Sequence, residues 1–125
     1  MMTPQPNEYW APSSPGDLAD RWTQLNLALL KAGTEAERRA AVCQLRRLRL
    51  PDFDDALVAI VDALGNVNER LWDLEADMRR LLTGPDTPDR RARLLEASRR
   101  LPLLKDTRAH LKARIDDLAA AVPTV

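Results

Sequence analysis

The sequence predicts an all-α protein, a small helical bundle of four helices built on a long antiparallel helical hairpin. Apolar residues in its second half recur with steps of three and four, the period of an α-helix. Capping residues, glycines and prolines divide the chain into four such runs, and no run alternates like a strand. A chain of 125 residues can bury one core, so residues 15–122 are predicted to form a single helical domain. Four of the nine prolines lie in residues 1–15, so residues 1–14 are predicted to be a flexible Pro-rich tail.

The first two helices are predicted from their capping residues. Ser14 has the position of an N-cap and Pro15 that of the first helical residue, which predicts a helix over 15–32. The stretch "TEAE", which begins at Thr34, has the pattern of a capping box. It predicts a second helix over 35–49.

The third helix carries the strongest signal in the chain, a run of apolar residues spaced 3, 4, 3, 4, 3, 4 and 3. The residues of this seam are Leu57, Ile60, Leu64, Val67, Leu71, Leu74, Met78 and Leu81. Such a heptad repeat is typical of a helix that packs along its whole length on another helix. A helix over 52–82 would be about 45 Å long at ~1.5 Å per residue, so it is predicted to be the central element of the fold.

The fourth helix is predicted over 88–121, with Thr87 as N-cap and Pro88 behind it. Pro102 lies inside this helix and is predicted to kink or divide it, because proline removes a backbone hydrogen bond. A second seam follows, with Leu101, Leu104, Arg108, Leu111, Ile115, Leu118 and Val122 in steps of three and four. Two seams joined by a short turn predict an antiparallel hairpin.

Charge and hydropathy exclude several classes of function. Nineteen basic and nineteen acidic side chains cancel, so nucleic-acid binding is not expected. No apolar stretch is long enough to span a membrane, and the N-terminus lacks the pattern of a secretory signal. A cytoplasmic location is therefore expected.

Residues that could carry catalysis or bind a metal are few. Cys43 is the single cysteine, so neither a disulfide within the chain nor a thiolate metal cluster is expected, and the side chain is predicted to pack as a small hydrophobe. The single histidine, His110, belongs to no catalytic motif and is predicted to be a solvated helix residue. No catalytic residue, metal site or cofactor is predicted, which favours a protein that is not an enzyme.

A mixed polar row runs beside the seam of the third helix and contains Asn68, Trp72, Glu75 and Arg79. In one interpretation the row is the solvated edge of a packed helix, with a Glu75–Arg79 pair worth ~0.3–0.5 kcal/mol. In the other, a further helix closes over the row and makes a buried polar network or the floor of a pocket. The second interpretation predicts that Trp72 is largely buried.

Arg108 occupies a seam position at which its neighbours in the pattern are apolar, so it needs an acidic or amide partner. A turn near residue 85 would leave Arg108 roughly 20 Å from the level of Glu75. Asn68 or Asp20 is therefore the predicted partner. A buried ion pair fixes helix register more than it adds stability, so the arginine indicates a specificity or binding role.

Three segments resemble a family of uncharacterised bacterial all-helical proteins. They are "LWDLEADMRR" preceded by Asn68, "KDTRAHLKARID" and "GDLADRWTQL", and the resemblance covers residues 16–118. The middle segment is similar to the pattern Asn-x-x-Leu-Trp-x-x-Glu-Asp-x-x-Arg. The matching positions are Gly16, Leu18, Asp20, Thr23, Leu25, Asn68, Leu71, Trp72, Glu75, Arg79, Asp106, Arg108, Ala109 and Lys112. The chain departs from the family pattern at Ala76, Pro102 and Lys105.

The resemblance implies that five residues belong together: Asp20, Asn68, Trp72, Glu75 and Arg108. It also implies a link to sugar transfer or cell-envelope polysaccharide, because such proteins tend to occur near genes of that kind. It implies no activity.

Two functions are consistent with these observations. The leading interpretation is a non-enzymatic helical accessory or interaction protein that binds a protein partner or forms a homodimer through the long hairpin. The alternative is a binding protein or enzyme for a small anionic or sugar-derived ligand, with a pocket between helices. The candidate binding residues are Asp20, Asn68, Trp72, Glu75, Arg79 and Arg108.

Overall fold

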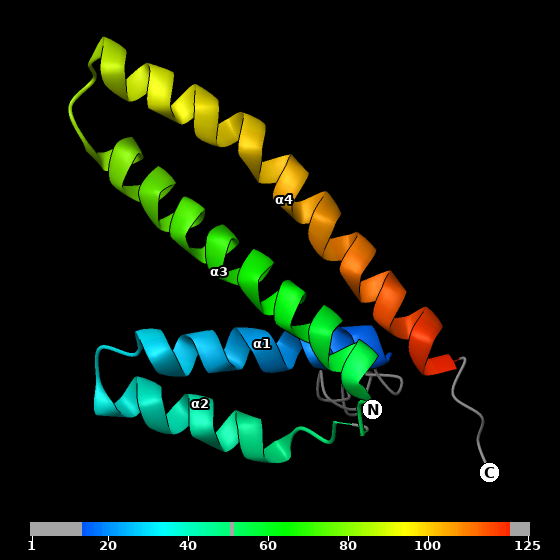
Figure 1. Cartoon of the computed structure of the whole chain (residues 1–125). Helices are drawn as coiled ribbons and strands as arrows, with labels where there is room; N and C mark the ends of the chain where they lie inside the picture. Colours follow the sequence, from blue (N-terminus) through cyan, green and yellow to red (C-terminus); the bar gives the residue numbers. More distant parts are fainter. Residues whose placement is uncertain (1–13, 51, 121–125) are drawn as a thin grey trace, which may run out of the picture.

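The computed structural model describes residues 14–50 and 52–120, and these residues form four helices and no strand (Figure 1). The helices are α1 (Pro15–Lys31), α2 (Glu35–Arg47), α3 (Asp55–Thr83) and α4 (Pro88–Ala120). The predicted all-α bundle on a long helical hairpin is confirmed. The flexible tail predicted for residues 1–14 lies, apart from Ser14, outside the described residues.

The helices begin where side chains can accept hydrogen bonds from their first free N–H groups. The Ser14 hydroxyl accepts from the Asp17 N–H and the Thr34 hydroxyl from the Glu37 N–H, as the capping patterns predict. Helix α3 begins three residues later than predicted, because Asp54 is its N-cap and accepts from the Leu57 N–H at 2.8 Å.

Pro102 does not divide α4, which continues as one helix from Pro88 to Ala120. The proline lacks the N–H that would bond to the carbonyl of Ser98, so one hydrogen bond of the ladder is missing. The turns on both sides remain helical. Of the two outcomes predicted at this position, division into two helices is therefore excluded.

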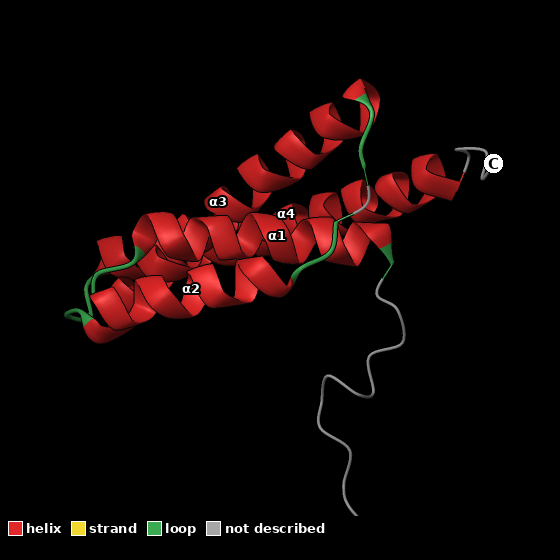
Figure 2. Cartoon of the chain, turned by 90° about the horizontal axis from the view of Figure 1, so that it is seen from below, coloured by secondary structure: helices red, strands yellow, loops and turns green. Residues whose placement is uncertain are grey.

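Helices α3 and α4 pack along each other as an antiparallel hairpin, and α1 crosses the open end of this hairpin and contacts both helices (Figures 1 and 2). Helix α2 packs on α1 alone. The outer half of the hairpin, where the α3–α4 turn lies, extends beyond α1 and α2 in Figure 1. Helix α1 therefore joins the two parts of the molecule.

The core lies at the open end of the hairpin, where three helices meet. Its buried members are Ala19, Leu57, Val61, Leu64 and Ile115. The predicted seam of α3 is buried from Leu64 to Leu74, whereas Ile60, Met78 and Leu81 are half-buried. Val61 lies outside the predicted seam and is nevertheless buried, because α3 packs against α1 as well as α4.

Cys43 is exposed, so the prediction that it packs as a hydrophobe is wrong. Helix α2 is covered only by α1, and Ala41 is its one buried residue. None of the described helices has the length and apolar character needed to cross a membrane.

Candidate functional site

A buried polar network lies where α1 crosses the hairpin. Asp20 and Thr23 come from α1 and Asn68 from α3, and all three side chains are buried. Asp20 and Thr23 are three residues apart, which places them on the same side of α1. The crossing brings this polar side of α1 against α3 and α4.

Asp20 is the centre of the network. Arg108 donates to both carboxylate oxygens, from Nε to Oδ1 at 3.0 Å and from Nη2 to Oδ2 at 2.5 Å. Asn68 Nδ2 donates to Asp20 Oδ1 at 2.9 Å, and Gln24 Nε2 donates to Oδ2 at 2.9 Å. Paired, charge-assisted bonds from one guanidinium to one carboxylate are strong and fix the geometry of both groups.

Thr23 completes the inner part of the network. Its hydroxyl accepts from Asn68 Nδ2 at 2.7 Å and donates to the backbone carbonyl of Asp20 at 2.8 Å. Among the described residues, no buried side-chain nitrogen or oxygen lacks a hydrogen-bond partner. A fully satisfied network of this kind is rigid and holds one helix arrangement.

The N-terminal part of α1 is attached to α4 by three further contacts. The N–H of Gly16 donates to Asp116 Oδ1 at 2.7 Å. Lys112 Nζ lies 2.8 Å from Asp17 Oδ1 and 3.9 Å from Asp20 Oδ2. Carboxylates near a helix N-terminus are favourable because the free N–H groups there carry partial positive charge.

The electrostatics favour the charged form of Asp20. Burial acts to raise its pKa, but the hydrogen bonds from Arg108 and Asn68 and the positive charge of Arg108 outweigh that effect and lower the pKa below the ordinary aspartate value. The hydrogen bond to Asp20 in turn raises the pKa of Arg108. Both partners are therefore charged at neutral pH.

The network also limits what Arg108 can bind. Its side chain is 32% exposed, but the Nε and Nη2 atoms are already bound to Asp20. An anionic ligand at this guanidinium would have to displace a buried carboxylate. The arrangement therefore holds α1, α3 and α4 in register.

The structure brings together only part of the predicted set of residues. Asp20, Asn68 and Arg108 are in contact, as predicted for the seam arginine. Their role in binding remains a prediction. Thr23, Lys112 and Gly16 join them; the sequence singled out these three only as matching positions of the resemblance. Gln24 and Asp116 were missed, although the i,i+4 spacing of Asp20 and Gln24 on α1 is a recognisable signal.

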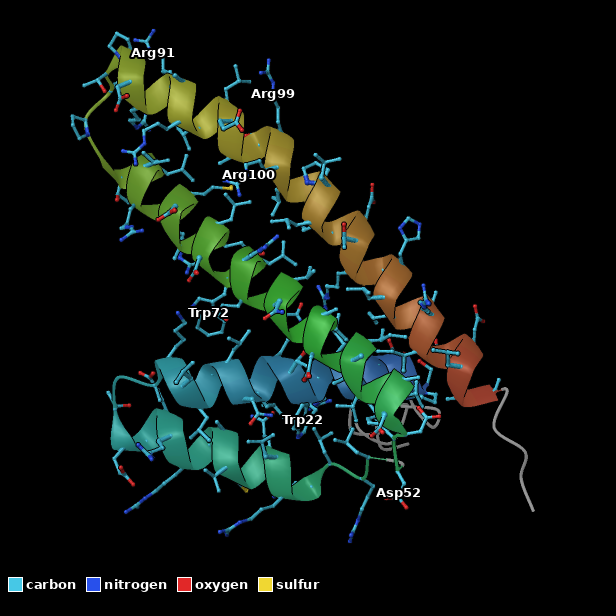
Figure 3. All side chains as sticks on the ribbon, in the orientation of Figure 1. Trp22, Asp52, Trp72, Arg91, Arg99 and Arg100 are labelled. Carbon is cyan, nitrogen blue, oxygen red and sulfur yellow. The ribbon has the colours of Figure 1, made fainter. Side chains whose placement is uncertain are left out.

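The outer part of the polar row is not enclosed. Trp72 is 39% exposed, so the prediction that it is largely buried is wrong; Glu75 and Arg79 are exposed as well. Figure 3 shows Trp72 leaving α3 on the side of the C-terminal half of α1. Helix α1 crosses α3 near Asn68 and diverges from it further out. Glu75 acts on Arg108 only through its charge, which is one of the weaker causes that raise the pKa of the arginine.

Residues of other chemical classes form no second centre in the described part of the chain. His110 is exposed, as predicted. Within residues 14–50 and 52–120, histidine, cysteine, aspartate and glutamate side chains form no group that could hold a metal ion.

Neither a protein-family model, nor a curated protein, nor a solved structure matches this chain. The resemblance to the uncharacterised helical family therefore remains a prediction, and the function has to be inferred from the geometry.

The lowered pKa of Asp20 predicts acid sensitivity. The folded-state pKa lies below the unfolded value of about 3.9, so the stabilisation is complete above that value and is lost as the pH falls through the folded-state pKa. Urea unfolding of the wild type and Asp20→Asn between neutral and strongly acidic pH measures this effect. We expect the stability difference between the two proteins to shrink below about pH 4. A constant difference would show that the charge of Asp20 does not contribute.

Proposed function

We propose that this protein is a non-enzymatic helical interaction protein that pairs with a second copy through the outer half of its α3–α4 hairpin. One observation carries the proposal. From residue 75 to residue 107 the hairpin contains a single buried residue, Ala97. The seam side chains of this half therefore keep part of their surface exposed, and a second hairpin packed on the first would cover them as in a four-helix bundle.

The side of the hairpin that remains uncovered follows from the helical period. Residues seven positions apart lie on the same side of a helix. The side of α3 that carries Asn68 therefore also carries Glu75 and Leu82, further towards the α3–α4 turn. By the same rule, the side of α4 that carries Arg108 also carries Leu101 and Leu94. Asp20 of α1 covers this side at the open end, and no described helix covers it further out.

We call this surface the outer face and define it by Trp72, Glu75, Met78, Leu82, Leu94 and Leu101. Leu82 is 61% exposed, while Met78, Leu94 and Leu101 are half-buried. Partly exposed tryptophan and aliphatic side chains framed by charged ones are typical of protein interfaces. The exposed part of the predicted polar row, including Arg79, thus borders the interface instead of lining a pocket.

The biological setting of the proposal rests on the sequence. The resemblance supports an accessory role in cell-envelope polysaccharide or sugar-transfer pathways, and composition supports a cytoplasmic location. The alternative of a small anionic or sugar-derived ligand at Arg108 has less support, because Asp20 occupies that guanidinium.

Light scattering at rising protein concentration tests the proposal. We expect a mass approaching twice the 14.1 kDa of one chain. Leu82→Glu should weaken association about tenfold or more, since a charge buried in an interface costs well over 1.4 kcal/mol.

The matched control is Leu103→Glu. Leu103 is 66% exposed, similar to Leu82, but it is not on the outer face. This variant should associate like the wild type. A wild type that stays monomeric at high micromolar concentration, or equal losses in both variants, would refute self-association through this face.

A further inference from the structure

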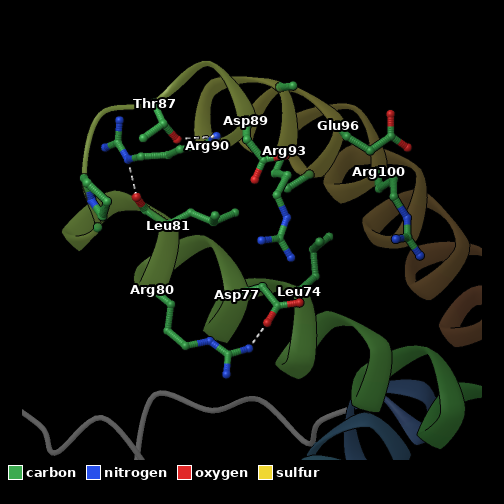
Figure 4. Close-up of a pocket in the computed structure, with 14 residues that line it drawn as sticks. Leu74, Asp77, Arg80, Leu81, Thr87, Asp89, Arg90, Arg93, Glu96 and Arg100 are labelled. Atoms are coloured by element: carbon green, nitrogen blue, oxygen red, sulfur yellow. Dashed lines mark hydrogen bonds and ion pairs between the residues drawn. The ribbon is translucent and has the colours of Figure 1, made fainter.

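A cavity of about 810 Å³ lies between α3 and α4 near their turn (Figure 4). Its lining includes Leu74, Leu81 and Ala97 together with Arg93 and Arg100. None of the residues that define the outer face lines this cavity. The cavity therefore opens on the other side of the hairpin. The carboxylates of Asp77, Asp89 and Glu96 line it as well, so apolar side chains and charged side chains of both signs meet in one groove between two helices.

Two other arginines at the cavity already have partners. Arg80 is paired with Asp77, and Arg90 donates to the carbonyl oxygens of Leu81 and Leu82 at the end of α3. These contacts build the wall of the groove. They leave both guanidinium groups engaged with the protein itself.

Arg93 and Arg100 differ from them, because neither guanidinium group makes a hydrogen bond or ion pair with the described part of the chain. Each has a carboxylate four residues earlier, Asp89 and Glu96, which is the favourable spacing for an ion pair on a helix. Neither pair forms. Figure 4 shows the Arg93 guanidinium directed into the space between the helices, and Figure 3 shows Arg100 on the side of α4 that faces α3, with Arg99 pointing away.

The spacing of these two cations defines what could bind them. Seven residues correspond to two helical turns, so their positions on α4 are about 10.5 Å apart. Carboxylates seven residues apart on a second helix repeat at the same distance. The apolar floor between the arginines fits aliphatic side chains on the intervening turn of such a helix, which is the usual mode of helix recognition in a groove.

We propose that this groove binds an amphipathic helix of a partner protein that carries two acidic residues seven positions apart. Arg93 and Arg100 bind the two carboxylates, and Leu74, Leu81 and Ala97 contact the apolar residues between them. The site is distinct from the outer face, so self-association and helix binding can succeed or fail separately.

The test is the binding of a labelled synthetic helical peptide, followed by fluorescence anisotropy at low ionic strength. The peptide carries Glu at two positions seven residues apart and Leu at the third and fourth positions after the first Glu. We expect the wild type to bind it, and Arg93→Gln and Arg100→Gln each to weaken binding about tenfold, as loss of a hydrogen bond between charged groups does. Arg99→Gln is the matched control and should bind like the wild type.

Four outcomes would overturn the proposal. They are no binding by the wild type, equal binding of a peptide with Gln in place of both Glu residues, equal loss in Arg99→Gln, and displacement of the peptide by inorganic phosphate at equal concentration. The last would indicate a small-anion site instead. Because light scattering measures self-association and anisotropy measures binding of the added peptide, a failure here leaves the result on self-association intact.

Discussion

Asp20→Ala is expected to lower the free energy of unfolding by about 3 kcal/mol, the low end of the range for breaking a buried ion pair. The low end applies because the Arg108 side chain keeps a third of its surface in water. The substitution leaves the arginine without its carboxylate and removes an acceptor from both Asn68 and Gln24. Urea unfolding at neutral pH measures the effect.

The double variant Asp20→Leu/Arg108→Leu separates two contributions to the free energy of unfolding. One is the loss of stability caused by an unpaired buried charge, and the other is the net stabilisation that the intact ion pair provides. Replacing both charges by apolar side chains should bring stability back to within about 1 kcal/mol of the wild type, because burying the pair costs nearly as much as its attraction returns. Asn68 keeps the Thr23 hydroxyl as a partner. A double variant as unstable as Asp20→Ala would mean that the pair stabilises the fold in its own right.

Gly16→Ala is expected to destabilise the protein by about 1–3 kcal/mol, the usual cost of overpacking. A Cβ at this position would lie 2.4 Å from the backbone carbonyl oxygen of Lys112 and 3.0 Å from Asp116 Oδ1. Backbone cannot rotate away as a side chain can, so the start of α1 must move from α4. That movement also lengthens the Gly16–Asp116 hydrogen bond.

Gly65→Ala is the matched control and should have the opposite sign. A Cβ there would meet Thr23 at an ordinary contact distance of 3.6 Å. Since Gly65 lies inside α3, alanine should stabilise the helix by about 0.5–1 kcal/mol. Thermal unfolding of both variants tests the pair of predictions, and a stabilising Gly16→Ala would show that α1 and α4 are not in tight contact.

These variants bear on function because the network sets how the molecule is built. Asp20 is the only residue that binds both Asn68 of α3 and Arg108 of α4 in the described structure. It therefore fixes where α1 crosses the hairpin and how much of the hairpin stays uncovered. If the outer face is the interface, variants that shift α1 should alter association as well as stability.

Helix positions could be predicted from the sequence because the signals are local. Ser14, Thr34 and Thr87 each accept from a backbone N–H three residues later, so each cap depends on a few adjacent residues. The start of α3 was placed three residues too early, since several aspartates compete for the cap and only Asp54 has the right geometry. At Pro102 the sequence left two outcomes open, because continuity of the helix depends on the strength of packing around one missing hydrogen bond.

The sequence by itself determined that Arg108 needs a partner, because a charge in an apolar seam must be compensated. The length of the hairpin restricted that partner to Asn68 or Asp20. Only the tertiary structure decided that Asp20 takes both bonds and that Asn68 supports Asp20 instead. It also decided that Trp72 stays half in solvent. The crossing point and angle of α1 depend on side chains from three helices packing together, and no local pattern encodes where one helix leaves another. Local patterns also do not predict that Arg93 and Arg100 lack partners. The i,i+4 spacing to Asp89 and Glu96 favours ion pairs, and only the directions in which these side chains leave α4 show that none forms.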